Sequence, residues 1–234
     1  MKRYMLIAIL AVLFAVPSLA QHQHEHQTQR RSTGNTPELT IDTIDAIMDA
    51  VKRKPEYYDS ALKRFESADS TASLLDLAIV YYAYPLSQNY KGGYYHDDAD
   101  KVNNLIKAGK KLDAYRSAME ARKSNPASLS LLYYAICSAP EDTDVYYDLC
   151  KKFTSLCRCI LAFGDGQTCE NPHKVIYVAD EYMLLYHYMN AEIQGQSLME
   201  DFCDKIEYKD KDGNEGEIYF NVKDILTRHH KDAK

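Results

Sequence analysis

The sequence predicts an α+β protein in which α-helical hairpins are followed by a small antiparallel β-sheet. Between Thr36 and Phe163, apolar residues recur at helical spacing, and helix start signals coincide with changes of the apolar phase. After Gly164 the pattern changes to short runs of β-branched and aromatic residues separated by turn residues. We therefore expect a helical region over residues 36–163 and a small α+β region over residues 164–234, packed on the helices.

The amino terminus has the pattern of a secretory signal peptide. Lys2 and Arg3 precede an apolar run over residues 5–16, and small residues end the segment at Ala20. We expect cleavage after Ala20 and export to the periplasm or to the exterior of the cell. The apolar run is shorter than the roughly 20 residues that a membrane span needs, and no comparable run follows, so no membrane span is predicted.

The next segment, residues 21–35, reads QHQHEHQTQRRSTGN and contains no large apolar side chain. Such a composition cannot form a core and is typical of a disordered tail. His22, His24 and His26 could chelate a divalent metal, but a flexible tail has no preformed coordination geometry. The favoured interpretation is a polar spacer, and no cofactor is predicted.

The charge of the chain argues against two classes of partner. Two of the 28 basic residues lie in the predicted signal peptide, so 26 basic residues face 34 acidic ones in the remainder, a net charge of −8. An acidic protein is unsuited to nucleic acid and to anionic membrane surfaces. A protein or peptide partner is compatible with this charge, and the oligomeric state is not predicted.

Start signals divide the helical region into elements. Pro55 opens one helix, and Ser70 can cap the next, which ends near Tyr84. The helical pattern lapses over residues 85–103, where Gly92 and Gly93 mark a loop and Asp97 and Asp98 suit the first turn of a short helix. Further helices follow, of which the longest is predicted over residues 141–163. Its apolar residues recur on a single stripe, as expected for a helix that packs one face on a core.

Two stretches of the helical region resemble each other. LLDLAIVYYA (residues 74–83) and PASLSLLYYA (residues 126–135) end alike at an offset of 52, and each follows a more polar helix. The echo is similar to tetratricopeptide-type helix pairs, which repeat about every 34 residues. The longer spacing here would include an insertion at a tyrosine-rich loop. Stacked helix pairs expose concave surfaces that bind peptides or partner proteins.

The region after Gly164 is predicted to form strands and one terminal helix. KVIYV (residues 174–178) has the composition of a short strand, and residues 180–190 are predicted as a short helix or a continuation of that strand. Asp212-Gly213 predicts a hairpin between DFCDKIEY and EIYF. Residues 222–229 complete the region as a helix.

The six cysteines permit up to three disulfides in an oxidising compartment. The absence of a C-x-x-C pair argues against structural zinc. Four of the six lie in apolar helical stretches, where a thiol often serves as a small buried hydrophobe. Cys169 and Cys203 lie outside the helical body and are the candidate disulfide pair.

The segment FGDGQTCENPHKVIYVADEY (residues 163–182) crowds polar residues around a Gly-Asp-Gly turn. Gly164 suits a helix C-cap and Asp165 the turn that follows, so the favoured interpretation is a corner between the last long helix and the sheet. This interpretation assigns the segment a structural role.

An alternative hypothesis makes the same segment an active site. If Asp165, His173, Asp180 and Glu181 converged, they could bind a divalent metal or perform acid–base catalysis. The spacing of the four residues does not require convergence, and neither an H-E-x-x-H nor a G-x-S-x-G signature is present. We therefore name no catalytic residue in the favoured interpretation.

Tyrosine is the strongest feature of the composition, with 20 tyrosines and no tryptophan. Tyrosine offers a large amphipathic contact surface and is common where proteins recognise partners. The tyrosines of the predicted loop are expected to be exposed and to form a binding surface: Tyr84, Tyr90, Tyr94 and Tyr95. The favoured function is a non-enzymatic protein- or peptide-interaction module.

Five motifs are spread along the chain: YYAYPLSQNYKGG, the helix pair around Asn125-Pro126, the Gly-Asp-Gly turn followed by KVIYVADEY, Gln196-Ser197-Leu198, and IYFN at residues 218–221. Together they resemble an uncharacterised family of exported bacterial proteins with a domain of unknown function. The resemblance covers about residues 55–222 and implies an exported location without implying an activity, a substrate or a catalytic residue. It marks the following as features shared with the family: Gly164, Asp165, Gly166, Asp180, Glu181 and Tyr182.

Overall fold

The computed structural model describes residues 41–67, 72–92 and 97–232 of the chain. The predicted signal peptide and the predicted tail with His22, His24 and His26 lie outside the described residues. Of the described helices, none combines the length and the apolar character that crossing a membrane would require.

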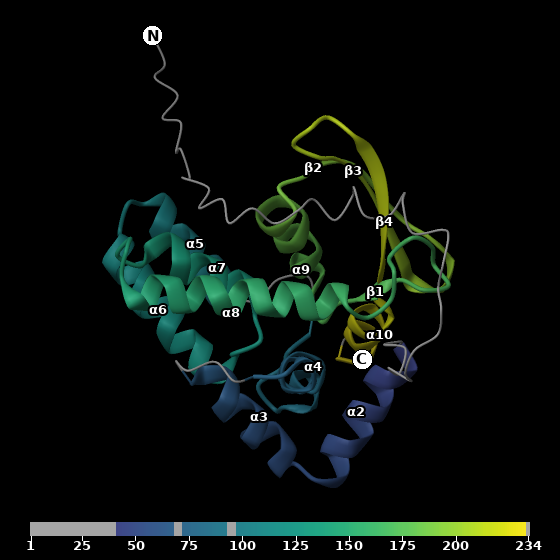
Figure 1. The fold of residues 1–234 in the computed structure, drawn as a ribbon, viewed down its shortest axis with the longest axis horizontal. Helices are drawn as coiled ribbons and strands as arrows, with labels where there is room; N and C mark the ends of the chain where they lie inside the picture. Colours follow the sequence, from purple (N-terminus) through teal and green to yellow (C-terminus); the bar gives the residue numbers. More distant parts are fainter. Residues whose placement is uncertain (1–40, 68–71, 93–96, 233–234) are drawn as a thin grey trace, which may run out of the picture. The chain divides into compact units, whose positions relative to one another are not determined.

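Helices make up the first part of the described chain (Figure 1). Their bounds are α2 (Ile41–Arg53), α3 (Glu56–Glu66), α4 (Leu74–Tyr82), the short 3-10 helix η1 (Tyr84–Leu86), α5 (Asp97–Lys107), α6 (Lys111–Ser124), α7 (Leu129–Ser138) and α8 (Asp144–Leu161). Side-chain caps fix where three of them begin. Ser73 and Asp76 form a reciprocal capping box at α4, Ser128 caps α7 and Thr143 caps α8.

The two most apolar helices, α4 and α7, are buried over most of their length. Each follows a more polar helix that packs on it, α3 on α4 and α6 on α7. The amphipathic α8 packs on both α4 and α7 through a stripe that includes the fully buried Leu156 and Ile160. This burial explains why the apolar period of the sequence located these helices correctly.

The sheet has four strands in the order β1-β4-β3-β2. Their bounds are β1 (His173–Lys174), β2 (Glu192–Leu198), β3 (Cys203–Lys209) and β4 (Glu215–Asn221). The hairpin predicted at Asp212-Gly213 joins β3 to β4, and Gly213 has the positive φ of 87° that this turn requires. The α+β class is confirmed, but the sheet is mixed because β1 runs parallel to β4.

The connecting helices between β1 and the hairpin are short. The α-helix α9 (Val178–Tyr182) continues directly into η2 (Met183–Tyr188), which is a π-helix, and the 3-10 helix η3 (Glu200–Phe202) separates β2 from β3. The chain then forms α10 (Lys223–Asp232) as the predicted terminal helix.

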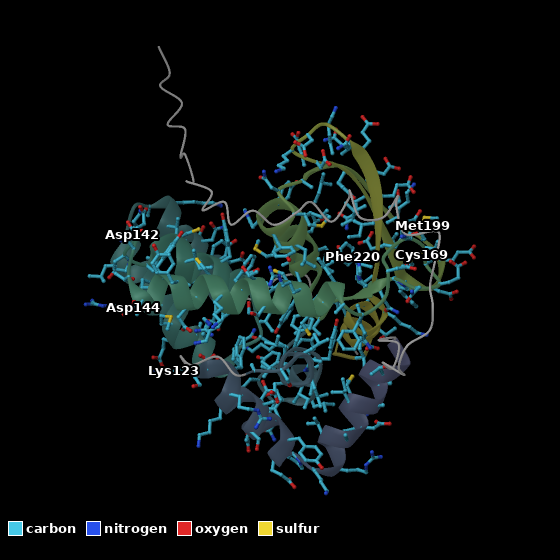
Figure 2. All side chains as sticks on the ribbon, viewed as in Figure 1. Lys123, Asp142, Asp144, Cys169, Met199 and Phe220 are labelled. Atoms are coloured by element: carbon cyan, nitrogen blue, oxygen red, sulfur yellow. A yellow bond between two sulfur atoms is a disulfide. The ribbon has the colours of Figure 1, made fainter. Side chains whose placement is uncertain are left out.

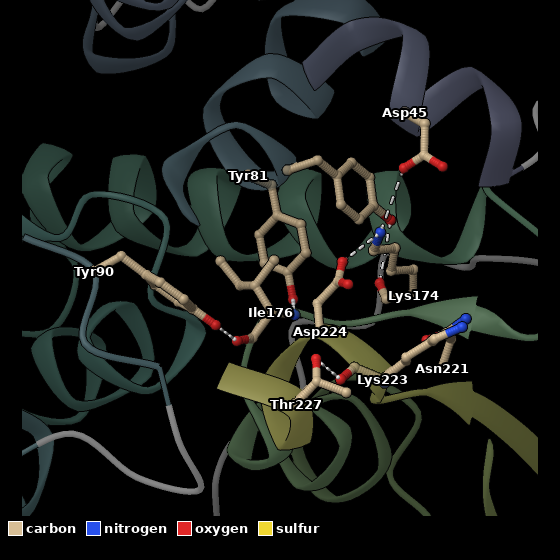
Figure 3. Close-up of polar contacts among 10 residues, drawn as sticks. Asp45, Tyr81, Tyr90, Lys174, Ile176, Asn221, Lys223, Asp224 and Thr227 are labelled. Carbon is tan, nitrogen blue, oxygen red and sulfur yellow. Dashed lines mark hydrogen bonds and ion pairs between the residues drawn. The ribbon is translucent and has the colours of Figure 1, made fainter. Parts of the chain in front are cut away.

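The strand predicted for KVIYV is wrong beyond Lys174, because tyrosine hydroxyls replace a neighbouring strand (Figure 3). The hydroxyl of Tyr81 accepts a hydrogen bond from Ile176 N at 3.2 Å, and that of Tyr90 donates to Ile176 O at 2.6 Å. The hydroxyl of Tyr82 donates to Lys174 O at 3.3 Å. Buried backbone groups need partners, and here side chains from the helical region supply them.

A single hydrophobic core runs through both predicted regions. It includes Ile44 of α2, Leu132 of α7, Ile160 of α8 and Phe220 of β4. The α+β part is therefore packed on the helices through shared buried side chains.

Candidate functional site

The chain between Phe163 and Tyr177, called the joint below, leads from α8 into the sheet. Asp165 N and Gly166 N both donate to Asn171 O, at 3.1 and 3.0 Å, and Gly166 O accepts from Tyr219 N of β4 at 3.0 Å. Gly164 and Gly166 have positive φ values of 77° and 63°. The Gly-Asp-Gly turn thus closes on itself and docks on the sheet.

Steric constraints also require glycine at positions 164 and 166. A Cβ atom on Gly164 would lie 2.3 Å from Pro172 O, and one on Gly166 would lie 2.4 Å from the ring of His173. Both approaches are far shorter than a van der Waals contact. The motif shared with the family is explained here by close packing of the backbone.

Asp165 and His173 hold the joint together. Asp165 Oδ1 accepts from Gln167 N at 2.9 Å, which forms an Asx turn. The buried His173 ring lies against Gly166, and its Nδ1 is 3.0 Å from Phe163 O. Burial lowers the pKa of His173, so the neutral ring is favoured, with Nδ1–H donating to the carbonyl. Every one of these contacts stabilises the corner.

Asp180 occupies a different place, at the start of α9. It is 1% exposed, and its Oδ2 accepts from the Tyr81 hydroxyl at 2.6 Å. Burial raises the pKa of Asp180 to about 7, while the hydrogen bonds from Tyr81 and from the backbone of Tyr177 and Leu129 act in the opposite direction. The buried Asp180 of α9 therefore links this helix to α4 and α7 through hydrogen bonds.

Glu181 points to the sheet and meets Asp204 of β3. The two side chains, called the carboxyl pair below, are 0% and 6% exposed. Gln196 Nε2 of β2 donates to Asp204 Oδ2 at 2.6 Å and to Glu181 Oε2 at 3.4 Å. Gln196 Oε1 accepts from the Tyr182 hydroxyl. The pair thus lies at one end of a hydrogen-bond chain that reaches Tyr182.

The four residues of the active-site hypothesis therefore lie in two separate groups. Asp165 and His173 interact with each other and with the backbone of the joint. Asp180 and Glu181 interact with Tyr81 and with the carboxyl pair. Within residues 41–67, 72–92 and 97–232, no group of three His, Cys, Asp or Glu side chains is placed to hold a metal ion.

Two of the four tyrosines expected at the surface, Tyr84 and Tyr90, are buried and half-buried respectively. Tyr84 is only 2% exposed, and its hydroxyl donates to Ser124 O at 3.1 Å. Tyr90 is half-buried between the rings of Tyr84 and Tyr177, with centroid distances of 5.7 and 5.3 Å. Tyr94 and Tyr95 lie outside the described residues. Tyr84 and Tyr90 are therefore part of the packing, and their hydroxyls bond to the backbone carbonyls of Ser124 and of the buried Ile176.

A cavity of about 250 Å³ lies where α5, α7, α9 and η2 meet, and we call it the tyrosine pocket. Four tyrosines line it, together with small, polar and apolar side chains. The lining consists of Ala99, Asp100, Asn103, Ser128, Ser130, Tyr134, Tyr177, Ala179, Tyr182, Met183 and Tyr186.

One wall of the tyrosine pocket is the segment Val178–Tyr188, called the pocket wall below. Tyr182 and Tyr186 are stacked on it, with ring centroids 6.4 Å apart. The wall changes from α-helix to π-helix at Met183, and such π-turns occur frequently at functional sites. Asp100 is the charged residue of the lining.

Of the four pocket tyrosines, Tyr182 was named from the sequence as a feature shared with the family, and none was assigned to a pocket. Tyr182 and Tyr186 are four residues apart, so on a helix they share a face, and this spacing was the available signal. Tyr134 and Tyr177 come from distant segments, and only the tertiary structure brings them together.

The disulfide joins Cys169 of the joint to Cys203 of β3, with Cα atoms 5.7 Å apart (Figure 2 labels Cys169). This is the pair that lies outside the helical body. The remaining thiols are free and buried or half-buried, and burial raises the pKa of each: Cys137, Cys150, Cys157 and Cys159. A raised pKa disfavours the thiolate, so these cysteines are poor nucleophiles.

The fold and the pocket describe an α+β domain with a mixed sheet and a tyrosine-lined cavity. A family model described as "Domain of unknown function (DUF4919)" matches residues 45–231, and the chain belongs to this family. The match includes the joint, the pocket wall and the carboxyl pair, so all three are parts of the family domain. No curated protein and no solved structure matches the chain.

Proposed function

We propose that this protein is an exported module that binds a segment of a partner protein or peptide, and that the tyrosine pocket is its binding site. The observation that carries the proposal is the convergence of Tyr134, Tyr177, Tyr182 and Tyr186 on one cavity of about 250 Å³. Tyrosine rings provide rigid contact surface at low entropic cost, and their hydroxyls orient a polar ligand.

The chemistry of the lining favours a basic side chain as the group that enters the pocket. Asp100 supplies a negative charge, and the lining contains no lysine, arginine or histidine. Aromatic faces attract cations, with Arg and Lys as the usual partners. The net charge of −6 of the full chain would also attract basic segments over longer distances.

Export is part of the proposal and rests on two supports. The first is the signal-peptide pattern over residues 1–20. The second is the disulfide between Cys169 and Cys203, because disulfides persist in oxidising compartments outside the cytosol. Cell fractionation tests it: we expect full-length chain to yield a processed product beginning at Gln21 outside the cytoplasm. An unprocessed cytoplasmic product would contradict this part.

Binding can be tested with short peptides selected from a random display library on the purified protein. We expect selected peptides to contain Arg or Lys, and replacing that residue by Gln to weaken binding about tenfold, or about 1.4 kcal/mol. Tyr186→Ala should weaken binding at least as much, because Tyr186 lines the pocket and is 43% exposed.

The matched control is Tyr57→Ala, because Tyr57 on α3 is also 43% exposed and does not line the pocket. It should leave affinity unchanged. Equal losses for the two variants, or peptides without a basic residue, would contradict the assigned pocket or its ligand class respectively.

A second candidate is an acid–base enzyme in the segment Gly164–Tyr182. The pKa of about 7 at Asp180 favours it, since a general acid or base works best near the operating pH. Against it, Asp180 is 1% exposed and is held by Tyr81. Substrate turnover that disappears in Asp180→Asn, with the fold intact by circular dichroism, would establish this candidate over the binding module.

A further inference from the structure

The carboxyl pair is a buried acidic group that the proposed binding does not use. Glu181 and Asp204 approach each other from α9 and β3 and are 0% and 6% exposed. Two ionised carboxylates that are buried side by side repel each other and lose their hydration, which is costly unless each oxygen has a donor.

The available donors are too few for two carboxylates. Gln196 supplies hydrogens to Asp204 Oδ2 and Glu181 Oε2. Glu181 Oε1 and Asp204 Oδ1 are buried, and no donor of the described residues reaches them. A proton on one carboxyl removes this deficit, because the protonated Glu181 then donates to Asp204.

The surroundings of the pair favour keeping that proton. From α9, the nearby charged group is Asp180, which is itself acidic. From β2, Gln196 and Leu198 face Asp204, and on β4 its partner in the ladder is the apolar Phe220. His187 of η2 is instead stacked on Tyr133, with ring centroids 3.7 Å apart. Burial raises the pKa of both carboxyls, and Asp204 and Asp180 raise that of Glu181 further.

The pair is connected to the tyrosine pocket through one side chain. Gln196 uses its amide nitrogen on the carboxyl pair and its amide oxygen on the Tyr182 hydroxyl. Tyr182 lines the tyrosine pocket. A change in how the carboxyls use the amide hydrogens therefore changes the orientation of the acceptor that holds Tyr182.

We propose that Glu181 and Asp204 share one proton and that its release to solvent moves Gln196 and loosens Tyr182, so that the tyrosine pocket responds to pH. With the proton present, the carboxyls are bonded to each other and Gln196 is fixed. Without the proton, the two carboxylates repel each other, and the Gln196 amide must donate hydrogen bonds to both of them. Its hydrogen bond with the Tyr182 hydroxyl is then weakened. The shared proton stands by itself, whereas the effect on a ligand rests on the proposed function.

The test is an NMR titration of the ligand-free protein. Side-chain carboxyl carbons of Glu181 and Asp204 and the ring signals of Tyr182 are followed from acidic to mildly alkaline pH. We expect the carboxyl pair to titrate as a coupled unit, with its last proton lost well above the ordinary range of a carboxyl, and the Tyr182 signals to shift with that step.

Two variants distinguish this pH response from a purely structural role of the carboxyl pair. Glu181→Gln keeps a donor to Asp204 but cannot lose a proton, so the Tyr182 signals should become independent of pH in that range. Asp204→Asn leaves Glu181 as the remaining carboxyl of the pair, so the coupled titration of two carboxyls should be lost, and this variant serves if Glu181→Gln does not fold. Glu200→Gln, at an exposed glutamate of η3, is the matched control and should leave the wild-type titration unchanged.

Independent titration of the two carboxyls at ordinary values would overturn the shared proton. A coupled titration that leaves the Tyr182 signals unmoved would overturn the link to the pocket. Because no ligand is present, these outcomes are distinct from a failure of the proposed function, which would appear as absence of peptide binding to the tyrosine pocket at every pH.

Discussion

The joint and the pocket wall are consecutive in the chain, yet their polar residues have different roles. In the joint, Asp165 and His173 bond to the local backbone and fix a turn. In the pocket wall, Tyr182 and Tyr186 line a cavity, while Asp180 and Glu181 are buried beneath it. A dense run of polar residues is therefore not one site, because neighbouring residues such as Asp180 and Glu181 contact different partners.

Tyrosine illustrates the same division. The hydroxyls of Tyr81, Tyr82 and Tyr90 serve the buried backbone of residues 174–176 (Figure 3). The tyrosines of the pocket wall, Tyr182 and Tyr186, instead line a cavity. A high tyrosine content thus reflects two roles in this protein, one in the core and one at the pocket.

The largest expected effect comes from the joint. Gly164→Ala should lower the free energy of unfolding by about 4 kcal/mol, because it adds strain at positive φ and a clash with Pro172 O. Urea unfolding followed by circular dichroism measures this loss.

Gly109→Ala is the matched control for the joint. Gly109 has a similar φ of 73°, but a Cβ there would meet nothing within 4 Å, so only the strain remains, about 1 kcal/mol. Equal losses at the two positions would show that the close approach at the joint does not matter.

The next effect concerns Asp180 beneath the pocket wall. The ordinary pKa of 3.8 rises to about 7 in the fold, so between these values the folded state binds more protons than the unfolded state. The free energy of unfolding therefore falls as pH rises through this range, by up to about 4 kcal/mol.

Asp180→Asn cannot titrate and lacks this contribution. We therefore expect the free energy of unfolding of the wild-type protein to fall relative to that of the variant as pH rises from 4 to 7. Unfolding both proteins across this pH range measures the difference. Parallel profiles would mean that Asp180 titrates normally in the folded protein.

A smaller effect distinguishes the two kinds of tyrosine. Tyr81→Phe removes a donor from Asp180 and an acceptor from Ile176 N, and should cost about 2 kcal/mol. Tyr186→Phe alters an exposed side chain and should change stability by less than about 0.5 kcal/mol. The same urea experiment measures both, and comparable values would remove the distinction between core and pocket tyrosines.

Much of the fold could be predicted because local signals coincide with burial. The stripe of α8 and the Asp212-Gly213 hairpin each have a short-range physical cause, and both are present close to the expected positions. The sheet pairing of His173 and Lys174 with β4 could not be predicted, because parallel partners are distant in sequence.

The candidate site was less accessible to sequence reasoning. Asp180 and Glu181 were named in the active-site hypothesis, and Gln196 was named within a motif of the family resemblance. Asp204 was not named, and it meets Glu181 and Gln196 only after β2 and β3 pack beside α9. The expectation of exposure failed for Tyr84, because the composition of a loop does not reveal which hydroxyls a buried backbone needs.

Local signals in the sequence accounted for the α+β class, the start of α3 at Pro55, the hairpin and the glycine corner, because caps, turn residues and apolar period act over a few residues. The cap expected at Ser70 was wrong, since Ser73 caps α4. The tertiary structure alone decided which tyrosines form the pocket, why KVIYV is not a strand, and which acid meets Glu181. Those features depend on contacts between residues up to about a hundred positions apart, such as Tyr81 and Asp180, and local propensity carries no information about such contacts.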